Sequence, residues 1–356
     1  MSRRRELSDI RSMRRLLPAL AWMAACSNSE PPPPLTNATS LQCPSPGALP
    51  FRLLSSGFQK SSNQALATDN PRNKDEASDT IGNPGGLTAS VYLADVQSPS
   101  MAPVDYAGTK ARTMPTQGAF ATPLAGENVS LWYYDIDKAA WQSVGRGKTA
   151  DDGTYDLPAT GFVAPNGRPI YSMLEADGSC AEHFDYLLAP GSKVVVTDID
   201  GTLTTNDAEF IMQVADGSYV PMMMTAADKL MQAWSMKGYP VIYLTARPAV
   251  YRVESRGWLA DQGFPDGPLI TETGGKAADV YKTLWLNRMV QSFQWTVVAA
   301  YGNADTDITA YANAGIPKAQ TFIVGPLAGN SGTVAIPNMD FTQHIATFVA
   351  AQPANQ

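Results

Sequence analysis

The chain has little histidine and no excess of positive charge, and both shortages narrow its function. Only two of its 356 residues are histidine, His183 and His344, so a histidine base or a histidine-rich zinc site is not expected. The formal net charge is −7, which argues against nucleic acid as a partner because phosphate backbones attract clustered lysine and arginine. No apolar run reaches the ~18–20 residues that a membrane-spanning helix needs.

Residues 1–26 have the order of a bacterial export signal. Arg14 and Arg15 precede a short apolar run, Leu16–Ala25, and Cys26 follows two alanines. This order resembles the lipobox of bacterial lipoproteins, in which the cysteine is acylated and becomes the mature N-terminus. We expect an exported lipoprotein, anchored to a membrane on the periplasmic or cell-surface side. The alternative is a fortuitous apolar run in a cytosolic protein.

Cysteine is scarce, with three in the chain. If Cys26 carries a lipid, Cys43 and Cys180 remain, and in an exported protein they can form one disulfide. Two unrelated free thiols are the alternative.

The next two segments differ in composition. Residues 27–85 are rich in proline, serine, asparagine and glycine, without hydrophobic periodicity, so we predict a disordered tether. Residues 86–190 carry short β-branched and aromatic runs separated by turn signals, which predicts a small antiparallel β-sandwich. Within it Asp135 and Asp137 form an Asp-x-Asp pair, but no Gly-Thr follows, so we interpret them as a hairpin tip.

Residues 191–356 alternate between strand and helix signals. The expected strands are 193–198, 241–245, 296–301 and 321–324. The expected helices are 226–236, 250–262, 276–289 and 307–314. Such alternation predicts an α/β domain with a mostly parallel sheet and helices on both faces. Ligands then bind beyond the carboxyl ends of the strands.

Polar residues follow each of the first three strands. Asp198 and Asp200 follow the first, Thr245 ends the second, and Asn303 and Asp307 follow the third. Two carboxylates held close together call for a cation between them, and oxygen ligands select Mg²⁺. A metal-shielded phosphate can then be attacked by an aspartate to form an aspartyl-phosphate.

The run Asp198-Ile199-Asp200-Gly201-Thr202 resembles the first motif of the haloacid dehalogenase superfamily. The resemblance implies roles for the other residues as well. Asp198 would be the nucleophile and a metal ligand, and Asp200 the general acid and base that also lends its backbone carbonyl to the metal. Thr245 would bind the transferred phosphoryl group. Asp307 and Asn303 would complete the Mg²⁺ site, whereas Asp305 is interpreted as a surface residue.

Residues 193–324 are also similar to the C-terminal domain shared by lipin phosphatidate phosphatases and some phosphatidylinositol transfer proteins. Lys282 matches the lysine of the third motif, which offsets charge on the nucleophile and phosphate, and Lys276 is the alternative. Arg247 is expected to anchor the loop after the second strand. Ala304 stands where this family usually has arginine, a departure that bears on head-group contacts.

The resemblance implies Mg²⁺-dependent hydrolysis of a phosphomonoester, with phosphatidate as the favoured substrate. Some family members have lost the acid pair and only bind phosphatidic acid, but here Asp198 and Asp200 are both present. The segment between Thr202 and Val241 is too short for a large cap domain, which suits a bulky or membrane-embedded substrate. The alternatives are a non-catalytic phosphatidic-acid-binding module and a phosphatase for small soluble esters.

Overall fold

The structure is a computed structural model, and it describes most of the chain from residue 126 to residue 355. Gaps lie at residues 127, 136, 151–153, 157–168, 175–179, 216–218, 249–250 and 273–276, and between residues 80 and 123 only strand segments are described. The expected signal peptide with Cys26, the tether up to residue 79, and Cys43 of the expected disulfide lie outside the described residues. Those expectations stay predictions.

The described part of the segment 86–190 is made of strands. One five-stranded sheet has the order β1-β11-β10-β7-β8. Its strands are β1 (Thr80–Gly82), β7 (Asn128–Asp135), β8 (Ala140–Lys148), β10 (Pro169–Leu174) and β11 (Cys180–Leu187). The pairs β7–β8, β7–β10 and β10–β11 are antiparallel as expected, whereas β1 runs parallel to β11. Since β1 lies within residues 27–85, the prediction of a disordered tether is wrong for residues 80–82. Three two-stranded pieces pair β2 (Ser90–Tyr92) with β9 (Thr154–Asp156), β3 (Ala94–Asp95) with β6 (Thr122–Pro123), and β4 (Met101–Val104) with β5 (Arg112–Pro115).

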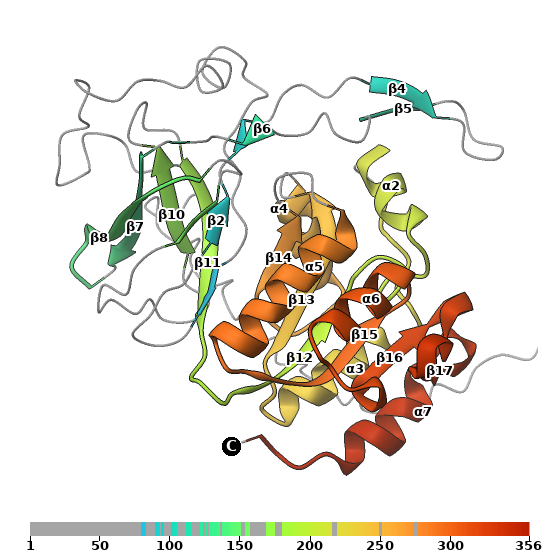
Figure 1. Cartoon of the computed structure of the whole chain (residues 1–356). Coiled ribbons are helices and arrows are strands. Elements are labelled where there is room, and N and C mark those ends of the chain that lie inside the picture. The colour runs from blue at the N-terminus through green and yellow to red at the C-terminus, as the bar shows by residue number, and fades with distance from the viewer. Residues whose placement is uncertain are drawn as a thin grey trace, which may run out of the picture. The chain divides into compact units, whose positions relative to one another are not determined.

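The second half of the chain forms a six-stranded parallel sheet with helices, so the α/β prediction is confirmed (Figure 1). The strand order is β14-β13-β12-β15-β16-β17. The strands are β12 (Lys193–Thr197), β13 (Val241–Pro248), β14 (Leu269–Glu272), β15 (Thr296–Gly302), β16 (Thr321–Val324) and β17 (Val334–Ile336). The helices are α2 (Ala208–Ala215), α3 (Ala227–Met236), α4 (Arg252–Asp261), α5 (Ala278–Asn287), α6 (Asp305–Asn313) and α7 (Thr342–His344). Because β12 and β15 are neighbours, the chain reverses its direction of winding beside β12, which is where such sheets bind ligands.

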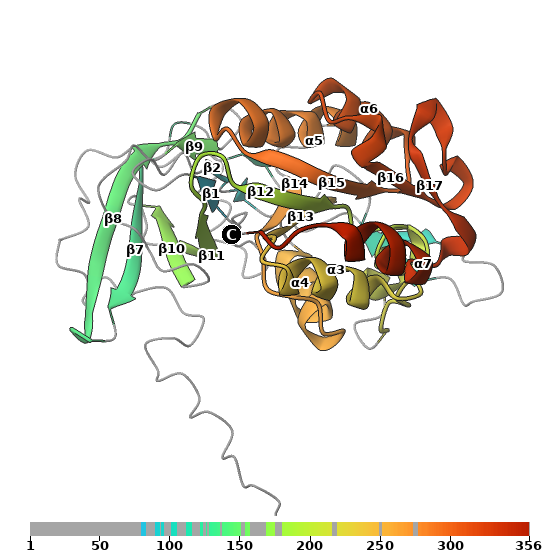
Figure 2. The same cartoon turned by 90° about the horizontal axis from the view of Figure 1, so that it is seen from below.

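The sheet is buried on both faces because its central strands are almost wholly apolar. Residues 194–197 of β12 are all buried, as expected for a parallel strand covered on both sides. Val195 packs in one core cluster and Val194 and Val196 in the other, since alternate side chains point to opposite faces. Figure 2 shows α3, α4 and α7 on one side of the sheet and α5 and α6 on the other.

Four of these strands and α-helices were not predicted from the sequence: β14, β17, α2 and α7. Strands β14 and β17 have four and three residues and helix α7 has three, too few for a periodic pattern to stand out. Helix α2 was missed because eight residues give a helical pattern only about two turns in which to repeat. In the described part of the chain, none of the helices is long and apolar enough to cross a lipid bilayer.

His344 lies in the core, on the side of α3. The indole nitrogen of Trp234 donates to the hydroxyl of Tyr301 at 2.8 Å, and this hydroxyl lies 2.9 Å from Nε2 of His344. Since the hydroxyl accepts from Trp234, its own proton is available to the imidazole. Burial lowers the pKa of His344 to about 4, so the ring is neutral at physiological pH. This geometry gives His344 a structural role.

Candidate active site

The carboxyl ends of three neighbouring strands bring the predicted site residues together. Thr197, the last residue of β12, lies opposite Tyr243 of β13 on one side and Tyr301 of β15 on the other. Asp198 comes next on β12, and Thr245 lies two residues beyond Tyr243. Thr245 is still inside β13, which runs on to Pro248, so the second strand is longer than predicted.

The chain turns tightly after Asp198. The carbonyl of Ile199 accepts hydrogen bonds from the backbone N–H groups of Thr202, Leu203 and Thr204, at 3.2, 2.8 and 3.0 Å. Gly201 has a φ of +66°, and a Cβ there would lie 2.0 Å from the side-chain nitrogen of Asn303. The turn therefore requires glycine, both for its backbone conformation and for the close approach of Asn303.

Lys282 joins the two acidic residues predicted to face each other. Its Nζ lies 2.8 Å from Oδ1 of Asp198 and 2.6 Å from Oδ1 of Asp307. All three side chains are buried, and Lys282 comes from α5. Lys276, the alternative for this position, lies outside the described residues. Lys282 is therefore placed to offset charge on Asp198.

Asp307 also fixes the start of α6. Its Oδ2 accepts hydrogen bonds from the backbone N–H groups of Asn303 and Ala304, at 3.0 and 3.1 Å. These bonds satisfy backbone N–H donors at the N-terminus of the helix, where a negative side chain also interacts favourably with the helix dipole. The Asn303 side chain accepts from the hydroxyl of Thr202 at 3.3 Å and donates to Asp207 at 3.2 Å, so it joins the turn after β12 to the loop that follows.

Burial and nearby carboxylates make Asp198 hard to ionise. Burial, together with Asp307 and Asp200, raises its pKa to about 7, although Lys282 acts in the opposite direction. Burial alone would lower the pKa of Lys282, but Asp198 and Asp307 outweigh it and raise the pKa above its ordinary value. Lys282 is therefore charged at neutral pH.

The oxygen donors at this site fit a divalent cation. In the described ranges, no group of three or more histidine, cysteine, aspartate or glutamate side chains forms a metal site by itself. Three carboxylates, those of Asp198, Asp200 and Asp307, face the two cationic side chains of Lys282 and Arg247. The Asp198 and Asp307 carboxylates and nearby carbonyl oxygens are hard donors of the kind that a divalent cation prefers.

Gly302 leaves room for Asp307, and we predict that Gly302→Ala disturbs the site. The added Cβ would lie 2.5 Å from Cβ of Asp307 and 2.7 Å from its Oδ2, so the carboxylate must shift. We expect a loss of roughly 1–3 kcal/mol of stability, typical of overpacking, measured by urea unfolding. Gly257→Ala is the control: it meets no atom within 4 Å on helix α4, and should gain about 0.5–1 kcal/mol. Equal effects of the two changes would contradict the prediction.

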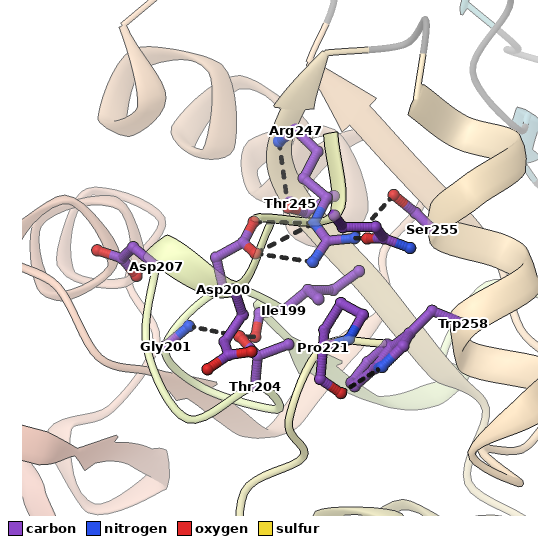
Figure 3. Close-up of polar contacts among 12 residues, drawn as sticks. Ile199, Asp200, Gly201, Thr204, Asp207, Pro221, Thr245, Arg247, Ser255 and Trp258 are labelled. Carbon is purple, nitrogen blue, oxygen red and sulfur yellow. Dashed lines mark hydrogen bonds and ion pairs between the residues drawn. The ribbon is translucent and has the colours of Figure 1, made fainter. Parts of the chain in front are cut away.

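The Asp200 side chain forms an ion pair with Arg247 (Figure 3). Nε of Arg247 lies 3.1 and 3.0 Å from the two carboxylate oxygens, and Nη2 lies 2.8 Å from Oδ1. Arg247 is 1% exposed. The guanidinium thus anchors the loop after the first strand. It also donates to Ser255 of α4 at 3.1 Å, which ties down the loop after the second strand as expected.

Thr245 is fully buried beside this pair. Its hydroxyl oxygen accepts a hydrogen bond from the backbone N–H of Arg247 at 3.2 Å. Because an accepting hydroxyl still carries its own proton, Thr245 retains a donor for a phosphate oxygen.

Three other predicted positions are also described. Asp305, interpreted as a surface residue, is exposed in the first turn of α6. Asp135 ends β7 and accepts hydrogen bonds from the backbone of Asp137 and Lys138. The prediction of a hairpin tip at Asp135 and Asp137 is thereby confirmed.

Reasoning from the sequence missed the segment between Thr204 and Met223, which we call the flap. These two residues form an antiparallel bridge, and α2 lies between them. Glu209 of α2 is 3% exposed, an unusual environment for a glutamate. Its Oε2 accepts from the hydroxyl of Tyr219 at 2.7 Å and from the backbone of Met222 at 2.8 Å. The sequence signal that could have pointed to this segment is Glu209, a single charged residue within the mostly apolar sequence AEFIMQVA.

Comparison with known proteins identifies similar sequences for this half of the chain. The family model described as PITM 1-3, LNS2 domain, matches residues 195–325. The protein retinal degeneration B of Drosophila melanogaster is 29% identical over 207 residues, which are 57% of this chain and 16% of that protein. Membrane-associated phosphatidylinositol transfer protein 3 of Mus musculus is 28% identical over 57% of this chain and 20% of its own length. The chain thus spans a fifth or less of these relatives.

Solved structures with some likeness include two phosphatases. The class C acid phosphatase from Bacillus anthracis has a TM-score of 0.27 and 16% identity, covering 33% of this chain and 53% of that one. Phosphoserine phosphatase in its apo form has a TM-score of 0.29 and 14% identity, covering 44% of this chain and 98% of that one. The family match agrees with the resemblance inferred from the motifs and indicates a lipid-related or phosphoester-related function.

Proposed function

We propose that residues 191–356 form a haloacid-dehalogenase-like domain that hydrolyses a phosphomonoester with Mg²⁺ through an aspartyl-phosphate on Asp198. The observation that carries the proposal is the buried pair of Asp198 and Asp307, joined by Lys282 at 2.8 and 2.6 Å at the carboxyl end of β12. A cluster held so closely at a ligand-binding edge is typical of a reactive site.

The reaction has two steps. In the first, an Asp198 carboxylate oxygen bonds to phosphorus while the bond from phosphorus to the ester oxygen breaks, and Asp200, which enters this step protonated, gives its proton to the departing alkoxide. In the second, a water oxygen bonds to phosphorus and passes a proton to the Asp200 carboxylate, while the bond from Asp198 to phosphorus breaks. Lys282 balances negative charge on Asp198, and the Thr245 hydroxyl donates to a phosphoryl oxygen.

In this proposal, four oxygen donors of this chain hold the Mg²⁺ ion. The carboxylates of Asp198 and Asp307, the backbone carbonyl of Asp200 and the amide oxygen of Asn303 would hold Mg²⁺. When bound, Mg²⁺ supplies a positive charge that shields the phosphate from the Asp198 carboxylate.

Phosphatidate is the favoured substrate because residues 193–324 resemble the domain that lipin phosphatidate phosphatases share with some phosphatidylinositol transfer proteins, and one matched relative is named for phosphatidylinositol transfer. This name also favours a second candidate, a module that binds an acidic phospholipid without hydrolysing it. The deciding experiment measures phosphate release from phosphatidate vesicles and from a soluble ester, with and without EDTA. We expect release from the vesicles that EDTA abolishes. Vesicle binding without release from either substrate would establish the binding module instead.

We predict that Asp307→Asn raises the Mg²⁺ concentration required for half-maximal activity by at least roughly 10-fold, since weaker perturbations of metal sites already have effects of this size. The amide keeps the shape of the side chain but removes the charge that Lys282 and the metal share. The measurement is phosphate release across a Mg²⁺ titration. Asp305→Asn, in the same helical turn but exposed, is the matched control. An unchanged Mg²⁺ requirement for Asp307→Asn would exclude it as a ligand.

The proposal extends to the organisation of the chain. Residues 1–26 would be a signal peptide with a lipobox, 27–79 a tether, and the segment from β1 to residue 190 a β-sandwich domain. A lipid on Cys26 would then hold the phosphatase domain near its membrane substrate, on the periplasmic or cell-surface side.

A further inference from the structure

The guanidinium of Arg247 links three segments that are distant in the sequence. Two of its nitrogens bond the Asp200 carboxylate, and Nη1 donates to the hydroxyl of Ser255 in α4 at 3.1 Å. A side-on contact through two nitrogens defines the orientation of a carboxylate and not only its distance. Asp200 is therefore held with its carboxylate in one orientation.

Helix α2 contributes the third contact of the guanidinium. The ring of Phe210 lies 4.6 Å from Cζ of Arg247, within the range of a cation–π interaction. Gln213, one turn further along, has its Oε1 3.5 Å from Nη1. Phe210 also meets the ring of Tyr251 edge-on, with 5.2 Å between the ring centroids. The flap thus packs directly on the residue that orients Asp200.

The flap itself is held in a defined position. Glu209 accepts hydrogen bonds from both ends of the loop, including the hydroxyl of Thr205 at 2.8 Å and the backbone of Met222. The indole nitrogen of Trp258 in α4 donates to the carbonyl of Pro221 at 3.0 Å (Figure 3). The placement of α2 over Arg247 therefore follows from bonds at both of its ends.

We propose that Arg247 is the positioning residue of Asp200 and that α2 holds Arg247 in place, so that the flap controls the proton-transfer step. The inference rests on the proposed function, because Asp200 needs an orientation only if it exchanges a proton with a substrate. Arg247 is assigned no contact with the substrate, and its bonds are to the Asp200 carboxylate. It acts by holding the Asp200 carboxylate where the ester oxygen departs and where water later arrives.

This role predicts a dependence on the leaving group. An alkyl ester such as dioctanoyl phosphatidate loses a strongly basic alkoxide, which needs a proton as the bond from phosphorus to oxygen breaks. p-Nitrophenyl phosphate loses a weakly basic phenolate, which needs none. The ratio kcat/KM reports the first step alone, because the ester oxygen departs there. A disordered Asp200 should therefore reduce kcat/KM for the alkyl ester far more than for the aryl ester.

The first test compares Arg247→Lys and Arg247→Met on both substrates. For Arg247→Met we expect kcat/KM to fall on the order of 10²-fold for the alkyl ester and several-fold less for the aryl ester. Arg247→Lys keeps the charge but not the two-nitrogen contact. It should also lose more kcat/KM on the alkyl ester than on the aryl ester, with smaller losses on both. Equal losses on both substrates, or a gain on the alkyl ester, would overturn the proposal.

The second test changes α2 and leaves Arg247 intact. Phe210→Ala and Gln213→Ala should reproduce the selective loss on the alkyl ester at a smaller size, on the order of a few-fold, because each removes one weak contact. Gln232→Ala is the matched control, since Gln232 bonds the carbonyl of Gly263, and it should leave both rates unchanged. If Phe210→Ala kept the wild-type ratio of kcat/KM for the alkyl ester to kcat/KM for the aryl ester, α2 would have no part in positioning Arg247.

The third test needs no activity and so separates this inference from the proposed function. Hydrogen exchange of the backbone amides of α2, followed by mass spectrometry, should be faster in Arg247→Met than in wild type. Arg256→Met is the control, because Arg256 bonds the carbonyl of Gly267 at 2.9 Å, and α2 should exchange at its normal rate. A wild-type protein that hydrolyses neither ester would refute the proposed function. Unchanged exchange of α2 in Arg247→Met would refute the link between Arg247 and the flap.

Discussion

Asp198→Asn should abolish phosphate release while the domain still folds. The amide has the shape of the carboxylate, but it is too weak a nucleophile to attack phosphorus and it removes a charged oxygen from the metal site. Steady-state release on phosphatidate vesicles, measured across a Mg²⁺ titration, should stay at background even at saturating Mg²⁺.

The same change should not destabilise the domain. In wild type the Asp198 carboxylate is buried near Asp307 and Asp200, and asparagine removes the repulsion between them. Lys282 keeps its 2.6 Å ion pair with Asp307. We therefore expect a melting temperature without Mg²⁺ at or above that of wild type. Asp137→Asn, at the hairpin tip, is the matched control and should leave the rate unchanged. Near-normal turnover by Asp198→Asn would show that another residue is the nucleophile.

Asp200→Asn should reduce turnover by about 10²–10⁴-fold, the usual size of a general acid–base contribution. The departing alkoxide would have no proton donor and the attacking water no base. The loss should be largest on alkyl esters, which separates it from the effect of Asp198→Asn, where every substrate fails. Single-turnover release of the alcohol from the alkyl ester and of nitrophenolate from the aryl ester provides the measurement, because both products leave in the first step.

This variant should also lose stability, unlike Asp198→Asn. Arg247 is 1% exposed, and without the carboxylate its buried charge is only partly satisfied. The cost is roughly 1–3 kcal/mol, so the assays belong well below the melting temperature of the variant. A variant as stable as wild type would mean that the ion pair contributes nothing to the fold, and full activity would exclude Asp200 as the acid.

The sheet and the meeting of Asp198, Thr245 and Asp307 could be predicted because one rule covers them. Each of these residues lies at or just beyond the end of a buried strand, and parallel strands share one carboxyl edge. The placement of Lys282 was predicted from resemblance alone, because a lysine on a helix has no pattern that assigns it to a strand edge.

The pairing of Asp200 with Arg247 could not be predicted in this way. The two residues are 47 positions apart, and their contact depends on the length of β13 and on the turn after β12. Helix α2 has only eight residues, and its packing against Arg247 emerges only from the folded chain. The proposed positioning of Asp200 by Arg247 and α2 depends on these tertiary contacts.

Substitutions at different residues of this site should affect the stability of the fold to different degrees. Asp307 is both an ion partner of Lys282 and the group that satisfies the first turn of α6, so mutations there should be removed by selection even after catalysis is lost. Asp198 also pairs with Lys282, at 2.8 Å, but among the described contacts its side chain satisfies no helix terminus. Because Lys282 keeps its partner Asp307, a descendant can lose the proposed nucleophile in a single substitution while the domain still folds. We therefore expect relatives that have lost Asp198, and with it the proposed activity, to retain Asp307 and Arg247.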